Sequence, residues 1–152
     1  MARAKYQVLV IPYYIENEMI RYCLFHRSDI DAWQFIAGGG EDEDDSILTS
    51  AKREAMEEAS IDVSNHYIAL DTISSIPSNC FKNAKELWGK DCYVIPEYCF
   101  GVKLYTKEIT LSAEHIEYEW CDYPTAINKL KYDSNKTALW ELDSRIKNSF
   151  TD

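Results

Sequence analysis

The sequence predicts a single domain of the mixed α/β class. Its 152 residues are the length of one domain and are enough to bury a sizeable core. Runs of β-branched and aromatic residues alternate along the chain with segments whose apolar residues recur at helical spacing. No repeat, low-complexity tract or linker interrupts this alternation, so one domain is expected over residues 1–152.

Strands are predicted in the first part of the chain. Residues 6–15 and 19–26 are apolar and aromatic runs separated by three polar residues, a pattern typical of a β-hairpin. Residues 27–31 are polar and are predicted to form a loop. Residues 33–37 then predict a short strand that leads into three glycines, which we interpret as a tight turn.

The most regular helical pattern covers residues 46–60. This segment contains no Gly or Pro, and Ile47, Ala51, Ala55 and Ala59 recur every four residues, which gives the predicted helix one apolar stripe. Acidic side chains and a serine at its start can cap the helix and complement its dipole.

The second half of the chain predicts three strands followed by two helices. In order, they cover residues 67–76, 93–105, 117–122, 125–130 and 135–147. Residues 78–91 form a polar and aromatic insertion between the first two of these strands, with room for a helical turn.

The charge balance limits the choice of partners. Acidic residues outnumber basic ones by 26 to 16, and the formal net charge of −10 disfavours nucleic acid and anionic membrane surfaces as partners. A small anionic substrate is compatible with this charge if metal cations or a local basic group invert the field at its site.

Cysteine usage and hydropathy indicate the compartment. The five cysteines are odd in number and scattered, with no C-x-x-C pair, which favours free thiols over disulfide or zinc roles. The N-terminal apolar run is cut by Pro12, and no later segment approaches the roughly 20 apolar residues of a membrane span. We therefore expect a cytoplasmic protein with no membrane partner.

Three carboxylates gather on one face of the predicted helix. At about 100° per residue, Glu54, Glu57 and Glu58 fall within an arc of about 100° beside the alanine stripe. By itself this pattern is typical of a solvated charged face. The preceding glycines, however, could bring backbone carbonyls next to the acids, and oxygens of both kinds suit Mg²⁺ or Mn²⁺.

These residues resemble the box of the Nudix (MutT-like) hydrolase family, G-x5-E-x7-R-E-U-x-E-E-x-G-U, in which U is apolar. Seven of the nine specified positions agree, in a pattern that starts at Gly39 and ends with the run from Arg53 to Ile61. The two departures are Asp45, where the family has Glu, and Ser60, which replaces the final glycine. Serine is strained wherever a left-handed backbone conformation is needed.

The resemblance extends over most of the chain. The segments WQFIAGGG, SAEHIEYEWCDYPTA and YDSNKTALWEL resemble the bacterial dihydroneopterin triphosphate (dATP) pyrophosphohydrolase subgroup, which also lacks the last glycine of the box. This resemblance implies the Nudix fold, a mixed β-sheet sandwiched between α-helices. It also implies a metal-dependent enzyme that hydrolyses phosphoanhydride bonds.

Roles at the site follow from the same resemblance. Arg53 would orient Glu54 through a charge-assisted hydrogen bond, and Asp45 would hold Arg53. Glu114, outside the box, matches a further acid that approaches the metals in related enzymes, and its alternative is an exposed loop acid. The implied metal ligands are Gly38, through its carbonyl, and Glu54, Glu57, Glu58 and Glu114, and the implied catalytic set is Arg53, Glu54, Glu57, Glu58 and Glu114.

The implied reaction is attack by water on phosphorus. With Mg²⁺ or Mn²⁺ bound, a nucleoside or pterin triphosphate, of the dATP or dihydroneopterin triphosphate type, would be hydrolysed to the monophosphate and pyrophosphate. Either Glu54 or Glu58 would take the proton from the water.

Candidate substrate contacts lie outside the box. Arg27 can grip two phosphate oxygens, or it can form a surface salt bridge instead. The aromatic residues of and next to the insertion, Phe81, Trp88 and Tyr93, can stack on an adenine or pterin ring, or they can cap the core or form a dimer contact.

Two other functions stay open from the sequence. ADP-ribose and ADP-sugar pyrophosphatases of the family tend to carry a proline about fifteen residues after the box, and Pro77 follows Ile61 by sixteen. A non-catalytic nucleotide-binding Nudix domain is the other alternative, although such a domain is expected to have lost the metal glutamates that are present here. We expect a monomer or a homodimer.

Overall fold

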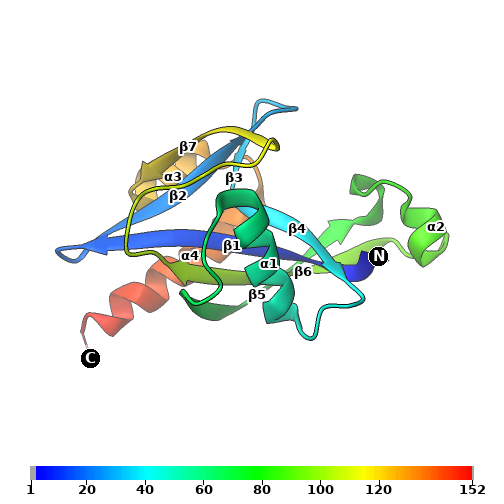
Figure 1. The fold of residues 1–152 in the computed structure, drawn as a ribbon, viewed down its shortest axis with the longest axis horizontal. Helices are drawn as coiled ribbons and strands as arrows, with labels where there is room; N and C mark the ends of the chain where they lie inside the picture. The colour runs from blue at the N-terminus through cyan, green and yellow to red at the C-terminus, as the bar shows by residue number, and fades with distance from the viewer. Residues whose placement is uncertain (1–2, 152) are drawn as a thin grey trace.

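The computed structural model describes residues 3–151, which form one mixed seven-stranded sheet covered by helices on both faces (Figure 1). The strands are β1 (Arg3–Glu16), β2 (Met19–Arg27), β3 (Trp33–Gln34), β4 (Ile36–Glu41), β5 (His66–Pro77), β6 (Val94–Lys103) and β7 (His115–Cys121). The helices are α1 (Ile47–Ala59), α2 (Ala84–Trp88), α3 (Tyr123–Lys129) and α4 (Asp133–Ser149), with a 3₁₀ turn at Ser78–Cys80. The predicted α/β fold class is confirmed.

Strand β1 is the centre of the sheet and changes partners along its length. Residues 7–13 of β1 pair in parallel with β6, and β4 runs antiparallel to β1 as far as Val10. From Tyr13 onward, β1 forms the predicted hairpin with β2. Strands β3 and β7 both pair with β2, while β5 pairs with β6. The sheet therefore branches where β1 leaves β4 and joins β2.

Two hydrophobic cores lie on opposite faces of the sheet. Because side chains alternate along a strand, Val8 and Val10 pack towards α1, whereas Leu9 and Ile11 pack towards α4. The alanine stripe of α1 is buried in the first core, as the sequence predicts. The second core takes its helical residues from α3 and α4, namely Ala126, Ala138, Leu139, Leu142 and Ile146.

The three glycines lie inside strand β4 and do not form the predicted turn. None of them has a positive φ angle, and Gly38 and Gly39 pair with Val8 and Gln7 of β1. The absence of a side chain at these glycines lets neighbouring side chains come close to the backbone of β4. A Cβ atom placed on Gly38 would lie 2.1 Å from the Glu54 carboxyl carbon, and one on Gly39 would lie 2.4 Å from the guanidinium carbon of Arg3.

Helix α1 has the boundaries that its sequence predicts. Ser46 is the N-cap, and its hydroxyl accepts a hydrogen bond from the backbone N–H of Thr49 at 3.1 Å. Ser60 is the C-cap and has left-handed backbone angles, φ 55° and ψ 34°, so the strain expected at this position is present.

Several other predicted boundaries shift. The single strand expected at residues 33–37 is two strands, β3 and β4, and the strand expected to reach residue 105 ends at Lys103. The insertion holds the 3₁₀ turn and α2, which project from one end of the molecule near the N-terminus (Figure 1).

Two further expectations concern the cysteines and membrane spans. All five cysteines are free thiols. Among residues 3–151, no helix is long and apolar enough to cross a membrane.

Candidate active site

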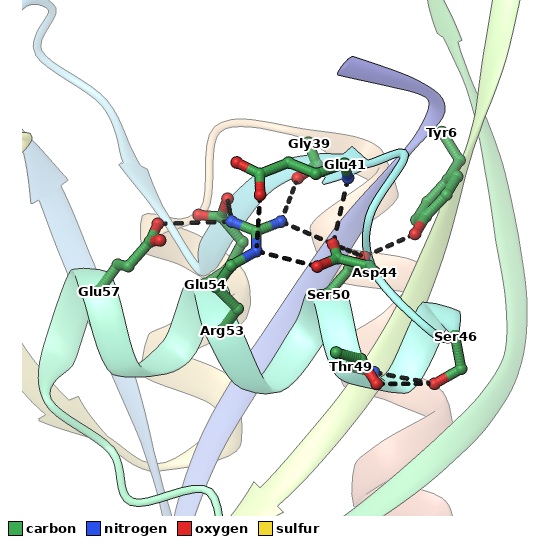
Figure 2. Close-up of polar contacts among 10 residues, drawn as sticks. All are labelled: Tyr6, Gly39, Glu41, Asp44, Ser46, Thr49, Ser50, Arg53, Glu54 and Glu57. Carbon is green, nitrogen blue, oxygen red and sulfur yellow. Dashed lines mark hydrogen bonds and ion pairs between the residues drawn. The ribbon is translucent and has the colours of Figure 1, made fainter. Parts of the chain in front are cut away.

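Arg53 is the centre of a polar network between α1 and the end of β4 (Figure 2). Its Nη1 donates to Glu54 Oε1 at 2.9 Å, and its Nη2 donates to the Gly39 carbonyl oxygen at 2.9 Å and to Asp44 Oδ2 at 3.0 Å. Burial lowers the pKa of the guanidinium, but the hydrogen bonds and charges of Asp44 and Glu54 outweigh burial and raise it. Arg53 therefore stays charged and fixes one oxygen of Glu54.

Asp44 holds Arg53, and the prediction that Asp45 does so is wrong. Asp44 also accepts hydrogen bonds from the Ser50 hydroxyl at 2.5 Å and from the Glu41 N–H at 3.1 Å (Figure 2). Together with Arg53, these donors lower the pKa of Asp44 against the effect of burial. Asp45 is exposed. Neighbouring side chains of a turn point in different directions, and the sequence pattern alone does not say which of the two acids turns inward.

Glu54 is a buried carboxylate of the Arg53 network. Its side chain is 11% exposed and lies against the Cα atom of Gly38. Burial raises the pKa of Glu54 to about 7. Arg53 opposes this rise, while the negative charges of Glu57 and Glu58 add to it. Glu57 and Glu58 thus add negative charge around Glu54 beyond what Arg53 offsets, and a further cation would stabilise the charged form of Glu54.

Glu58 faces a second group of polar residues, in the loop before β7 and at the start of that strand. The hydroxyl of Ser112 donates to Glu58 Oε2 at 2.7 Å, and His115 Nδ1 lies 3.5 Å from the same oxygen. Burial raises the pKa of Glu58, but the nearby His115, the hydrogen bond from the Ser112 hydroxyl and the nearby Glu114 bring it below its usual value. Burial and the charge of Glu58 raise the pKa of Glu114. Glu114 therefore lies beside the acidic face of α1, as expected if it joins the box glutamates.

The carboxylates gathered at this site are ligands of the kind that a hard divalent cation prefers. Glu54, Glu57, Glu58 and Glu114 supply carboxylate oxygens, the ligands that Mg²⁺ and Mn²⁺ prefer. Within residues 3–151, however, no group of three or more acidic, His or Cys side chains is already drawn together as a metal site. Arg53 and Ser112 hold one oxygen each of Glu54 and Glu58. The side chain of Glu57 is 54% exposed and has room to turn towards a cation.

A cavity of about 650 Å³ opens beside this acidic group. Glu114 and His115 line it, and so do Arg27 and Phe81, so two of the expected substrate contacts lie on its wall. Arg27 also forms an ion pair with Asp29, with Nε 2.7 Å from Oδ1, which is the alternative role that its sequence position allowed. The volume is in the range of small-molecule sites.

Trp88 and Tyr93 are not among the residues that line the cavity. Trp88 packs edge-on against Phe81 with the ring centroids 5.8 Å apart, and the guanidinium of Arg3 lies 4.7 Å from the centre of the Phe81 ring. Tyr93 is 74% exposed. Phe81 therefore borders the cavity, with Trp88 behind it, and Tyr93 is directed to solvent.

Sequence reasoning missed several polar residues of the site. Ser112 and His115 lie next to Glu114 in the segment SAEHIEYEWCDYPTA that carries the resemblance, but neither was expected at the site, and Gln7, Glu97 and Asn135 line the cavity from separate elements. One signal was available: Glu97 is the one acid in the strand VIPEYCFGVK, in which Lys103, the last residue, is the one other charged side chain. A charged residue in a buried strand needs a partner.

Comparisons with known proteins agree with this geometry. A model of the NUDIX domain matches residues 5–140. The dihydroneopterin triphosphate diphosphatase of Escherichia coli (strain K12) is 28% identical over 133 residues, which are 87% of each chain.

Two solved structures extend the comparison. A crystal structure from Listeria monocytogenes str. 4b F2365, described as that of a NUDIX hydrolase, has a TM-score of 0.85 and 45% identity, covering 96% of this chain and 97% of that one. The structure of the E. coli dihydroneopterin triphosphate pyrophosphohydrolase has a TM-score of 0.73 and 25% identity, covering 91% and 94%. With a family model over most of its length, a matching fold and the box acids in place, the chain belongs to the Nudix family of pyrophosphohydrolases.

Proposed function

We propose that this protein hydrolyses a pterin or nucleoside triphosphate to the monophosphate and pyrophosphate. The observation that carries the proposal is the juxtaposition of the acidic face of α1 with a ring-sized cavity, joined at Glu114 and His115. The likeness to the dihydroneopterin triphosphate diphosphatase of E. coli, spread over 87% of the chain, supports a triphosphate as substrate.

Nudix enzymes generally use divalent metals, and we propose Mg²⁺ or Mn²⁺ at this site, held by Glu54, Glu57, Glu58 and Glu114 with the carbonyl of Gly38. Such a metal, when bound, neutralises phosphate charge and lowers the pKa of water. Arg53 orients Glu54 for this role, and Arg27, on the cavity wall, can grip phosphate oxygens if it leaves Asp29.

The proposed hydrolysis needs water as its one co-substrate. The oxygen of a water molecule forms a bond to phosphorus, the bridging P–O bond between the monophosphate and pyrophosphate parts breaks, and a glutamate takes the proton. Glu54 and Glu58 are the two candidates for this proton, and each is already fixed by one hydrogen-bond donor that sets its direction. General-base catalysis of this kind contributes about 10²–10⁴-fold.

The experiment is a panel of substrates with Mg²⁺ or Mn²⁺, in which pyrophosphate and phosphate release are measured separately. Dihydroneopterin triphosphate and the deoxynucleoside triphosphates are expected to give pyrophosphate. The Glu54→Gln and Glu58→Gln variants are each expected to lose activity, and the variant of the general base should lose about 100-fold or more.

A Glu119→Gln variant is the matched control, because Glu119 is exposed on β7, away from the site and the cavity, and should keep full activity. Cleavage of ADP-ribose with no turnover of any triphosphate would overturn the proposal. So would unchanged turnover in both glutamate variants.

A further inference from the structure

Glu97 is a buried carboxylate that the proposed hydrolysis does not use. It lies on β6 directly beside Gln7 of β1, and both residues line the cavity. Only 2% of Glu97 is exposed. Its Oε2 accepts a hydrogen bond from Gln7 Nε2 at 2.5 Å, while its Oε1 has no hydrogen-bond partner among residues 3–151. A buried oxygen without a partner destabilises a protein, so its presence at a cavity calls for a ligand that satisfies it.

The neighbours of Glu97 fix it as an acceptor. Arg3 Nη2 donates to Gln7 Oε1 at 3.4 Å, and a guanidinium can only donate, so the NH₂ group of Gln7 must face Glu97. Asn135, on the same cavity wall, already accepts from the Phe35 N–H at 2.9 Å and donates to Ser134 Oγ at 3.3 Å. Glu97 Oε1 is thus left as an acceptor for a donor that enters the cavity.

The rest of the cavity suits a flat ring. Its apolar and aromatic walls are formed by Ile76, Pro77, Phe81 and Tyr132. Glu114 also lines the cavity and joins it to the acidic face of α1. A triphosphate whose phosphates extend towards Glu114 leaves the remaining walls, which include Glu97, for its ring.

We propose that Glu97 selects rings that present two adjacent N–H donors, the 2-amino-4-oxopyrimidine edge shared by pterins and guanine. An ionised carboxylate can accept from both donors at once, one on the unpaired Oε1 and one on the second lone pair of Oε2, beside the bond from Gln7. Adenine presents an acceptor nitrogen beside its amino group, which would face a lone pair of the carboxylate. This inference rests on the proposed function and narrows it, because it ranks pterin and guanine substrates above dATP.

Hydrogen bonds from two ring N–H donors would offset the cost of burying the charged Glu97 carboxylate. Burial raises the pKa of Glu97, with the hydrogen bond from Gln7 opposing the rise. Two further donors from a ring would stabilise the charged form and would satisfy Oε1. A site built to bond a donor discriminates strongly against an analogue without it, since its own buried group is then left unpaired.

The test compares two ligands that differ only in the 2-amino group. Binding constants are measured by titration calorimetry for the α,β-methylene analogues of dGTP and dITP, which resist cleavage of the α–β bond. The wild-type protein should bind the dITP analogue about 10–100-fold more weakly, as expected for loss of a hydrogen bond to a charged group. In Glu97→Gln the ratio should fall to about 3 or less, because the new NH₂ group opposes one of the two donors.

The Glu119→Gln variant should keep the wild-type ratio, and circular dichroism checks the fold of each variant. Equal binding of the two analogues by the wild-type protein would overturn the inference without any variant. An unchanged ratio in folded Glu97→Gln would also overturn it. Since binding is measured without turnover, failure to hydrolyse any triphosphate would contradict the proposed function and leave this test intact.

Discussion

Single residues hold the acidic face of α1 in position through Arg53. The guanidinium joins Glu54, the Gly39 carbonyl and Asp44 within 3.0 Å, so three separate parts of the chain meet at one side chain. Asp44 is anchored in turn by Ser50, which contacts Tyr6 of β1 (Figure 2). The direction of Glu54 therefore depends on residues that do not line the cavity.

This network gives a prediction with a built-in control. Asp44→Asn removes the charge that Arg53 contacts and should lower the free energy of unfolding by roughly 1.5–3 kcal/mol, the range for hydrogen bonds to charged groups. Turnover should fall as Glu54 loses its orientation. Asp45→Asn changes the neighbouring acid in the same way, but Asp45 is exposed and should leave both quantities unchanged. Urea denaturation and initial rates measure the difference, and equal effects of the two variants would contradict it.

A second prediction concerns Gly38. An alanine there would place its Cβ 2.1 Å from the Glu54 carboxyl group, so Gly38→Ala should displace Glu54, reduce turnover and destabilise the fold by roughly 1–3 kcal/mol. Gly89→Ala is the control, because Gly89 has a φ angle of 87° but no atom of residues 3–151 within 4 Å of the added carbon. That control should lose stability through backbone strain and keep its turnover. Wild-type turnover in Gly38→Ala would show that Glu54 does not need this contact.

At the scale of elements, α1 carries a strained C-terminus. Ser60 caps the helix in the left-handed conformation, and its N–H bonds the carbonyls of Ala55 and Met56. The same conformation explains why the family pattern has glycine at this place.

We therefore predict that Ser60→Gly stabilises the protein by roughly 0.5–1 kcal/mol, because glycine adopts this conformation without steric cost. Thermal and urea denaturation measure the gain. Ser144→Gly, inside α4, should instead destabilise by roughly 0.5–1 kcal/mol, since glycine is unfavourable in a helix interior. A loss of stability in Ser60→Gly would mean that the serine hydroxyl contributes more than its backbone strain costs.

At the scale of the whole molecule, Glu141 ties α4 to the edge strand β5. Its carboxylate accepts hydrogen bonds from the N–H groups of Asp71 and Thr72 at 2.7 Å and from Arg145 Nε at 2.7 Å. Burial alone would raise the pKa of Glu141, but these bonds and one from the Thr72 hydroxyl lower it from 4.5 to about 2. The charged form of Glu141 is thus favoured by folding.

The sign of the pH dependence follows from that lowered pKa. The stabilisation from Glu141 is fully present above the unfolded pKa of 4.5 and is lost as the pH falls towards about 2. Glu141→Gln should therefore be roughly 1–2 kcal/mol less stable than the parent at pH 7, with the gap closing between pH 5 and pH 2. Urea denaturation across this range checks the trend. Glu108→Gln, at an exposed loop position, should show no such gap, and a gap for Glu141→Gln that is constant with pH would contradict the assignment.

The sequence by itself determined the elements whose signal is local. Helix α1 was predicted to within a residue because its alanines repeat at helical spacing and Ser46 can cap it, and the spacing of Arg53, Glu54, Glu57 and Glu58 identified the family. The hairpin of β1 and β2 was also predicted, since both strands and their polar turn are continuous in the chain.

Tertiary structure decided every contact between distant segments. Whether Asp44 or Asp45 meets Arg53 depends on how a turn folds over β4, and the glycines prove to serve close approach rather than a turn. The cavity combines Gln7, Glu97 and Asn135 from three elements, and no spacing along the chain records that meeting. Local patterns reflect the geometry of one helix or strand, whereas a binding site depends on how those elements pack.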